Sequence, residues 1–161
     1  MRYQMKQELF SWGDDFYIKD ESGQDRFFVD GKALSIGKQL SFQDLTGKEL
    51  CFIDQKLLSW SPKYEIYRDG AVYATVTKEL FTFFNCRFDV ELADHGDIEA
   101  SGDFSDHSYT FTRNEKPVAQ VSMEWFTLGD NYGVEITEGQ DDVLILACTV
   151  VIDMACHQQR R

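Results

Sequence analysis

The chain has 161 residues, enough for one domain and hardly for two, and its 16 basic and 28 acidic residues give a formal net charge of −12. Proteins that bind nucleic acid without sequence preference normally carry a basic surface, so this charge disfavours that class and also disfavours adsorption to anionic lipid. Hydrophobic residues make up 43% and aromatic residues 14%, which excludes wholesale disorder and predicts a packed core. We therefore expect a single domain over residues 1–161.

Two pairs of similar segments follow one another along the chain. Phe16–Gly23 aligns without a gap with Leu40–Gly47, and the segment from Tyr64 to Thr82 aligns at one constant spacing with the segment from Tyr109 to Thr127. Each unit shows a strand pattern, a tight turn, a second strand and a short third strand. Four such units predict about twelve antiparallel strands. The turns carry typical turn residues: Ser22-Gly23, Thr46-Gly47, Asp69-Gly70 and Asn114-Glu115.

The strands alternate between apolar and polar residues, so that Val72, Ala74 and Val76 are expected to share one face. The polar stretch from Ala93 to Phe104 has no counterpart in the other units, and we expect one short strand in it, Ile98–Ser101. The uneven repeat spacing argues against a solenoid, whereas a closed barrel would leave no exposed strand edges. The expected short third strands include Leu57–Trp60, Leu80–Phe83 and Trp125–Leu128.

The apolar segment Val143–Cys156 is too long for a typical strand and is predicted to form a helix. Thr137 and Gln140 fit a capping box, and Asp141 and Asp142 then fall in the first turn, where the helix dipole favours anions. A helix that is apolar on every face must be buried on all sides or lie in a membrane. Closed sheets of about eleven strands can hold such a helix. The sequence therefore predicts a mainly β fold, a closed barrel of about 12 antiparallel strands around a central hydrophobic C-terminal α-helix.

Several short segments and the apolar helix that contains Asp153 carry a resemblance to a known family. The segments are Phe28–Gly31, Leu40–Asp44 followed by Gly47 and Leu50, Tyr64–Ile66, Asp69-Gly70 and Trp125–Tyr132. With these features the whole chain resembles the LURP-one-related family. The resemblance implies a fold like that of the C-terminal domain of tubby proteins and of phospholipid scramblases, and the compact length looks like that of bacterial members. It implies little about activity, because a fold does not determine a function.

We expect a cytoplasmic protein without a signal peptide or a transmembrane span. The first ten residues have no apolar core, and the longest apolar run, Val143–Ile152, is too short to cross a bilayer. No cysteine pair has the spacing of a metal or redox motif, so reduced, buried thiols are favoured over a zinc site, and no cofactor is expected. The cysteines are Cys51, Cys86, Cys148 and Cys156.

No catalytic signature is present in the sequence: it has no GxSxG, Walker loop, HExxH or GxGxxG motif. Asp103, Asp106 and His107 form a small polar cluster that lacks the glycine and glutamate of a calcium loop, so a turn is favoured over a metal site. Asp153 is the one charge near the apolar helix. We favour a structural role for it, with solvent contact at the barrel mouth or a polar partner, over functional burial.

The favoured functional hypothesis is a non-enzymatic binding or scaffold module with an unknown partner, acting as a monomer or weak oligomer. The family resemblance implies recognition of phospholipid or phosphoinositide headgroups by basic residues on the barrel exterior, although a solvated surface of mixed charge is the simpler interpretation. The alternatives are a scramblase-like membrane protein whose terminal helix inserts in lipid and an enzyme with an unrecognised site. The candidate headgroup ligands are Lys56, Lys63, Arg68, Lys78 and Arg87.

Overall fold

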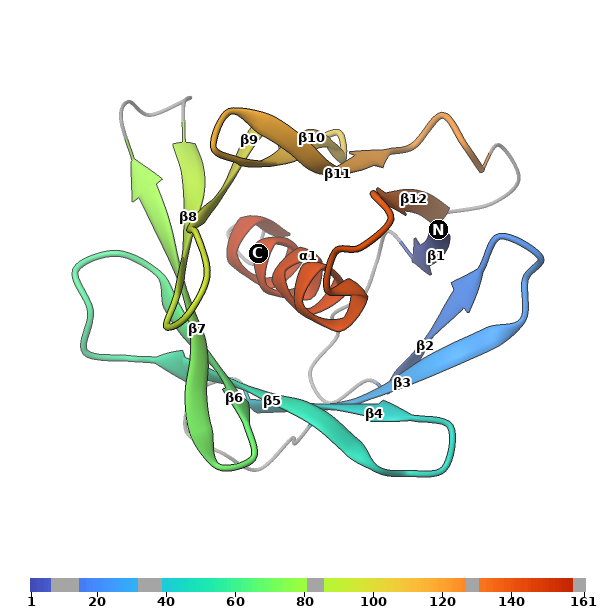
Figure 1. Ribbon diagram of the computed structural model, residues 1–161, viewed down its shortest axis with the longest axis horizontal. Coiled ribbons are helices and arrows are strands. Elements are labelled where there is room, and N and C mark those ends of the chain that lie inside the picture. Colours follow the sequence, from blue (N-terminus) through green and yellow to red (C-terminus); the bar gives the residue numbers. More distant parts are fainter. Residues whose placement is uncertain (7–14, 32–38, 81–85, 127–130, 158–161) are drawn as a thin grey trace.

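The computed structural model describes residues 1–6, 15–31, 39–80, 86–126 and 131–157. Within these residues, twelve antiparallel strands close into a barrel, and one helix runs through it (Figure 1). Each strand pairs with its neighbours in sequence, and β1 closes the barrel against β12. The predicted fold class is confirmed. The elements are β1 (Arg2–Lys6), β2 (Phe16–Asp20), β3 (Asp25–Gly31), β4 (Gln39–Asp44), β5 (Glu49–Lys56), β6 (Lys63–Arg68), β7 (Ala71–Leu80), β8 (Cys86–Leu92), β9 (Ile98–Asp103), β10 (Ser108–Arg113), β11 (Lys116–Ser122), β12 (Asn131–Ile136) and α1 (Asp142–His157).

The sequence repeat corresponds to a repeated hairpin. Asp20 and Asp44 occupy equivalent places in the first two hairpin turns. One oxygen of each carboxylate accepts hydrogen bonds from the backbone N–H and hydroxyl two residues on and from the backbone N–H four residues on. Gly23 and Gly47 then adopt φ of 83° and 87°, where a side chain would be strained. In four hairpins the pairing register of the two strands shifts at an equivalent position. These positions are next to Ile18, Phe42, Ile66 and Phe111.

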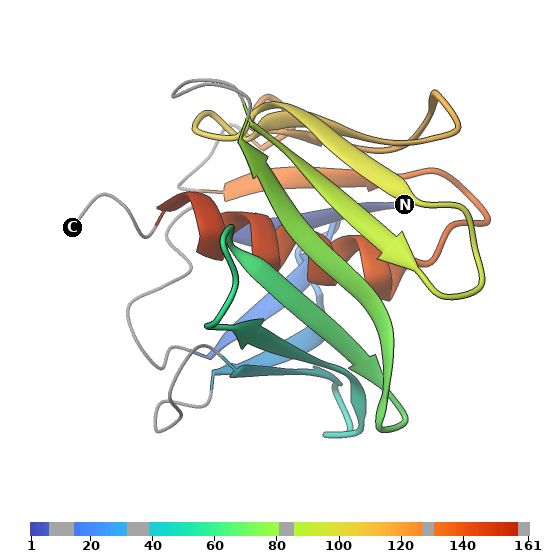
Figure 2. The ribbon, with the colours of Figure 1, turned by 90° about the vertical axis from the view of Figure 1, so that its left-hand side faces the viewer.

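The helix α1 runs through the interior of the barrel, as Figures 1 and 2 show. Every residue from Leu144 to Ala155 is at most 6% exposed. Sixteen residues at about 1.5 Å each make a rod of about 24 Å, long enough to run along the barrel axis. The strands pack large side chains against it, and those that are almost completely buried include Phe42, Ile53, Tyr64, Phe88, Phe111 and Val134. The prediction of a helix enclosed on all sides is confirmed.

The start of α1 differs from the predicted capping box. Asp141 is the N-cap: its Oδ1 accepts a hydrogen bond from the Leu144 N–H at 3.1 Å, and its carbonyl accepts one from the Ile145 N–H at 3.1 Å. Thr137 and Gln140 instead form a separate turn, in which the Gln140 N–H donates to the Thr137 carbonyl at 3.2 Å. The helix therefore begins later than the capping-box pattern predicts.

Three strand predictions also need correction. The segment from Leu57 to Trp60 is a turn rather than a short strand, because β5 already extends to Lys56 and the chain must cross to β6. Val72 is exposed, since the register shift beside Ile66 turns it away from the face of its strand that lines the barrel. The strand predicted to end at Ser101 runs on to Asp103. The other two expected third strands extend into residues 81–83 and 127–128, which lie outside the described residues.

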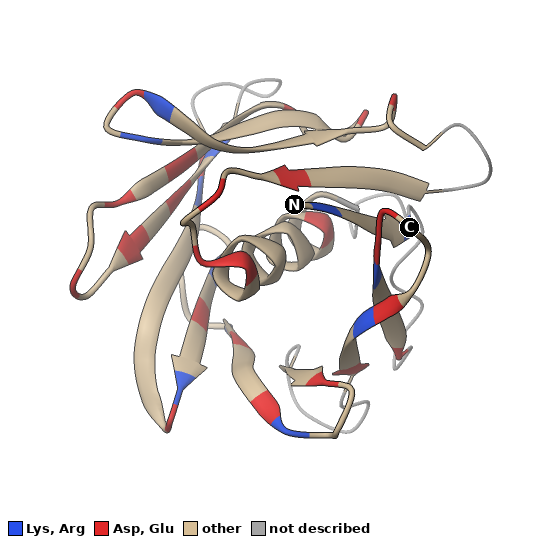
Figure 3. Cartoon of the chain, turned by 45° about the vertical axis from the view of Figure 1, so that its right-hand side comes forward, with Lys and Arg blue, Asp and Glu red and all other residues tan. Residues whose placement is uncertain are grey.

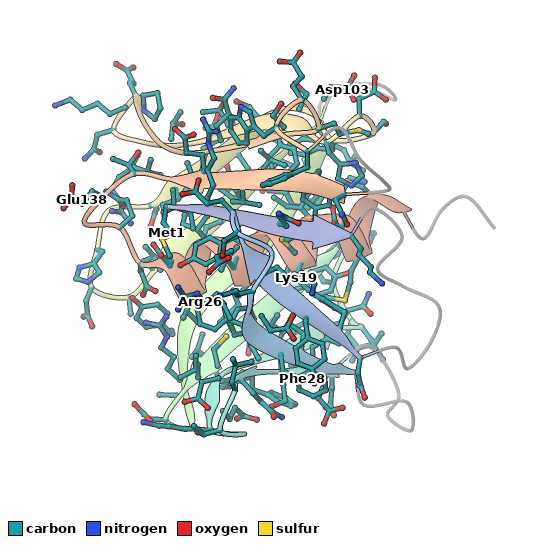
Figure 4. The ribbon with its side chains drawn as sticks, turned by 90° about the vertical axis from the view of Figure 1, so that its right-hand side faces the viewer. Met1, Lys19, Arg26, Phe28, Asp103 and Glu138 are labelled. Carbon is teal, nitrogen blue, oxygen red and sulfur yellow. The ribbon has the colours of Figure 1, made fainter. Side chains whose placement is uncertain are left out.

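The two ends of the barrel differ in their connections. The turn end carries the tight turns after β2, β4, β6 and β10 and the N-terminus of α1. The loop end carries the connection between β5 and β6, the turn between β9 and β10, and the C-terminal end of α1 (Figure 2). Glu138, just before α1, and Asp103, at the end of β9, lie at these opposite ends (Figure 4).

Candidate functional site

Two of the five candidate headgroup ligands are exterior residues that already have acidic partners. Lys56 Nζ lies 3.1 Å from Asp54 and 3.3 Å from Glu65, and Arg87 Nε lies 3.0 Å from Asp89. Acidic positions accompany basic ones along the strands of the barrel (Figure 3). These pairs leave little net positive charge for a phosphate group.

Arg68 is also engaged, and its partner is the N-cap of α1. Its two terminal nitrogens donate to the Asp141 carboxylate at 2.6 and 2.9 Å, and its guanidinium lies 4.1 Å from the centre of the Tyr73 ring. The Tyr73 hydroxyl donates to the same carboxylate at 3.1 Å. Arg68 therefore ties the barrel wall to the helix, which is a structural role.

Lys78 does not lie on the barrel exterior, and the expectation that placed it there is wrong. It is 7% exposed, because it stands on the same face of β7 as Ala74 and Val76. Burial raises the pKa of the nearby Cys156 thiol to about 12, and the positive charge of Lys78 opposes that shift. Lys63 is exterior and stands directly opposite Lys56 in the pairing of β5 with β6. The structure thus brings together only these two of the five within the described residues.

A groove of about 290 Å³ lies between the start of β5 and the β6–β7 turn. It opens because the ladder between β5 and β6 ends at Phe52 and Tyr67, whereas β5 begins three residues earlier, at Glu49. We call it the β5–β6 groove. It is lined by Glu49, Leu50, Cys51, Phe52, Asp54, Tyr67, Asp69 and Gly70.

The β5–β6 groove combines carboxylates with aromatic rings, and its wall already holds one ammonium group. Lys56 Nζ lies over the Tyr67 ring, 5.6 Å from its centre, and donates to the Tyr67 hydroxyl at 3.2 Å and to Asp54. The hydrogen bond to Asp54 raises the pKa of Lys56 above its ordinary value. Glu49 is fixed by a 2.6 Å hydrogen bond from the Ser41 hydroxyl. This surface favours cations over anions.

A second group of polar residues lies inside the barrel, at the loop end of α1. The Tyr132 hydroxyl donates to Asp153 Oδ2, and His107 Nε2 lies 3.4 Å from Asp153 Oδ1. The rings of His107 and Tyr132 stack with centres 4.3 Å apart. Burial raises the pKa of Tyr132 well above its ordinary value, and the Asp153 charge adds to that rise. We call His107, Tyr132 and Asp153 the interior polar cluster.

The sequence predicted only part of this cluster. The prediction that Asp153 has a structural polar partner agrees with its hydrogen bond from Tyr132 and its exposure of 2%. His107 lies in the predicted turn, where its φ is 47°, but the residue is only 4% exposed. Nothing in the linear pattern around His107 signals this burial.

A closed twelve-strand barrel with a buried axial helix defines a distinct class of protein, and the comparisons with known proteins agree on it. The model of the LURP-one-related family matches residues 1–153. The uncharacterized protein YxjI of Bacillus subtilis is 35% identical over 153 residues, covering 95% of this chain and 92% of the relative. The chain belongs to the LURP-one-related family, and its similarity to a Bacillus protein agrees with the expected bacterial type.

A solved structure supports the same fold. The X-ray structure of an Arabidopsis thaliana protein superposes with a TM-score of 0.66 at 18% identity, covering 95% of this chain and 90% of the other. At this identity the likeness concerns the fold alone. Among the described residues, no helix combines the length and apolar content needed to span a bilayer.

Proposed function

We propose that this member of the LURP-one-related family is a non-enzymatic binding module whose ligands contact the barrel exterior. The observation that carries the proposal is the filled interior: α1 occupies the barrel, and its residues from Leu144 to Ala155 are at most 6% exposed. The interior polar cluster is buried as well: within the described part of the chain its three residues are at most 4% exposed, which leaves their titratable groups little contact with a dissolved substrate. Turnover of a bound ligand by the purified protein would overturn the proposal.

The scramblase-like alternative is less favoured by the packing. It requires α1 to leave the barrel for the bilayer, which would expose the lining side chains of twelve strands to water. It would also carry Asp153 away from Tyr132 into an apolar medium, where an unpaired carboxylate is costly.

One surface favours peripheral lipid contact as a second function. The connection between β5 and β6 exposes Leu57 at 53%, Leu58 at 104% and Trp60 at 108%. We call these three residues the apolar loop, and Lys63 follows it at the start of β6. Tryptophan favours the membrane–water interface, and each leucine side chain gains about 1.5–3 kcal/mol on full burial. The apolar loop therefore suits shallow, reversible insertion among lipid headgroups.

Vesicle flotation tests this contact. We expect the protein to float with phosphatidylcholine vesicles and to gain little from added phosphoinositide, because Lys56, Arg68 and Arg87 already have carboxylate partners. Replacing Leu58 and Trp60 together by serine should abolish flotation. The matched control is Leu45→Ser, since Leu45 is 56% exposed in a turn at the opposite end of the barrel.

The same assay identifies the competing mechanism. Recognition of phosphoinositide headgroups by basic residues predicts binding only to anionic vesicles, weakened by high salt and by replacing Lys56 and Lys63 with glutamine. That result would overturn contact through the apolar loop. A complete lack of flotation at low salt would exclude both proposed forms of lipid binding.

A further inference from the structure

We propose that the β5–β6 groove binds the arginine or lysine side chain of a partner protein. This inference rests on the proposed role as a binding module. It uses the turn end of the barrel, whereas the apolar loop lies at the loop end, so the two surfaces can be tested separately.

The size of the groove selects a side chain rather than a whole cofactor. Its volume of about 290 Å³ falls at the lower limit of ligand cavities, which span about 300–1,000 Å³. The groove is framed by the paired strands β4, β5, β6 and β7, so its shape is largely formed before a ligand arrives. A groove of this size suits one extended side chain.

The charge of the groove selects a cation. Glu49, Asp54 and Asp69 place three carboxylates in its lining. Among the described residues, Asp54 has Lys56 as an ion-pair partner, whereas neither Glu49 nor Asp69 has a basic group within 4 Å. An incoming guanidinium or ammonium group would compensate this negative charge, and the overall charge of −12 attracts basic partners from a distance.

The aromatic residues of the groove would contact the remainder of the partner's basic side chain. Phe52 and Tyr67 stand opposite each other in the strand register and line the groove together. A cation is attracted to the face of an aromatic ring, and the apolar stem of arginine or lysine can lie along the same surface. Lys56 already provides this arrangement within the chain, with its ammonium over Tyr67 and hydrogen-bonded to Asp54.

Exposed apolar residues in the two bordering hairpins favour a protein as the partner. Leu45, in the turn before β5, is 56% exposed, and Val72, at the start of β7, is 44% exposed. A protein surface that inserts a basic side chain into the groove would cover both, whereas a free amine would leave them in water. A central charged anchor with apolar neighbours is a common arrangement at protein interfaces.

NMR titration of the full chain tests the assignment. The isotope-labelled protein receives the peptide acetyl-Gly-Arg-Gly-amide, its lysine counterpart, or a control with neutral citrulline in place of arginine. We expect shift changes confined to the amides of residues 49–54 and 67–70, with a Kd of about 1 mM for the charged peptides and no binding of the citrulline peptide. Equal shifts with citrulline, or no shifts with either charged peptide, would overturn the proposal.

Charge-neutral variants complete the test. Glu49→Gln keeps an acceptor for Ser41, and Asp69→Asn tolerates the φ of 49° at that position, so the double variant should fold. We expect it to weaken peptide binding about tenfold, while Glu91→Gln, on the exposed face of β8, should bind like the wild type. The spectrum itself reports folding, and Asp54→Asn serves as a second variant. Unchanged affinity in both the double variant and Asp54→Asn would exclude the groove as the site. Vesicle flotation of the double variant should be unaffected.

Discussion

Replacing Asp141 by alanine should weaken the attachment of the central helix to the barrel wall. This carboxylate accepts two hydrogen bonds from Arg68, at 2.6 and 2.9 Å, and one from the Tyr73 hydroxyl. It also caps α1 by accepting the Leu144 N–H at 3.1 Å. One side chain thus joins the helix to β6 and β7, and alanine removes all of these bonds at once.

The expected loss in the free energy of unfolding is about 3 kcal/mol. Removing an N-cap costs about 1 kcal/mol. The side chains of Arg68 and Asp141 are 27% and 31% exposed, so their pair lies between a surface ion pair and a fully buried one, and we assign it about 2 kcal/mol. Asp141→Asn keeps the cap and should lose about 2 kcal/mol. At about 2–4 °C per kcal/mol for a chain of this size, alanine should lower Tm by about 6–12 °C.

The loss should also depend on pH. Burial alone would raise the pKa of Asp141, but the hydrogen bonds from Arg68 and from the Leu144 N–H outweigh it and lower the pKa below its ordinary value. A carboxyl with a lowered folded-state pKa stabilises the fold above its unfolded pKa of about 3.9, and this stabilisation disappears as the pH falls through the folded value. The difference between wild type and Asp141→Ala should therefore be constant near neutral pH and shrink below about pH 4.

Urea unfolding followed by circular dichroism measures these differences. A double-mutant cycle with Arg68→Met isolates the pair, and its coupling energy should be about 1–2 kcal/mol. Asp141→Glu tests the geometry, because the longer side chain keeps the charge but displaces the cap. An alanine variant within about 0.5 kcal/mol of wild type, or strictly additive losses in the cycle, would refute this account of the helix attachment.

Two further predictions concern the core and the repeated turns. Ile145→Asp and Val151→Asp should each abolish soluble expression, because both residues are at most 1% exposed and an unpaired charge there would be buried; recovery of either variant in the soluble fraction would contradict the enclosed position of the helix. Asp20→Ala should lower the urea midpoint more than Asp44→Ala, since Asp20 also accepts a 2.9 Å hydrogen bond from Arg26, which lies on the side of the barrel seen in Figure 4. Equal midpoints would mean that the Arg26 pair adds nothing.

The fold could be predicted because its main signals are local. The turn residues repeat, and the segment Val143–Cys156 is apolar on every face, which allows few arrangements in a single domain. The position of the helix cap could not be predicted in this way. Thr137 and Asp141 both satisfy the local rule, and the contact that distinguishes Asp141 comes from Arg68, 73 residues earlier in the sequence.

The candidate sites likewise include features that the sequence predicts and features that it does not. The burial of Lys78 was within reach of the sequence, because the alternation of β7 places it on the same face as Ala74 and Val76. The pairing of His107 with Asp153 was not, since it depends on a backbone conformation in one turn and on the rotation of a helix far along the chain. The β5–β6 groove likewise arises where two strands stop pairing, which no single strand pattern records.

The helix that completes the core is also the element made after all twelve strands. A ribosome adds about 5–20 residues per second, so the strands emerge one after another without the rod that their inner faces require. The ring itself is sealed by β1 and β12, which come from opposite ends of the strand order, and pairings of such sequence separation form slowly. The inner faces of the strands therefore lack their packing partner until α1 has been synthesised. Until then the apolar side chains that will contact α1 are the surface that a chaperone would bind.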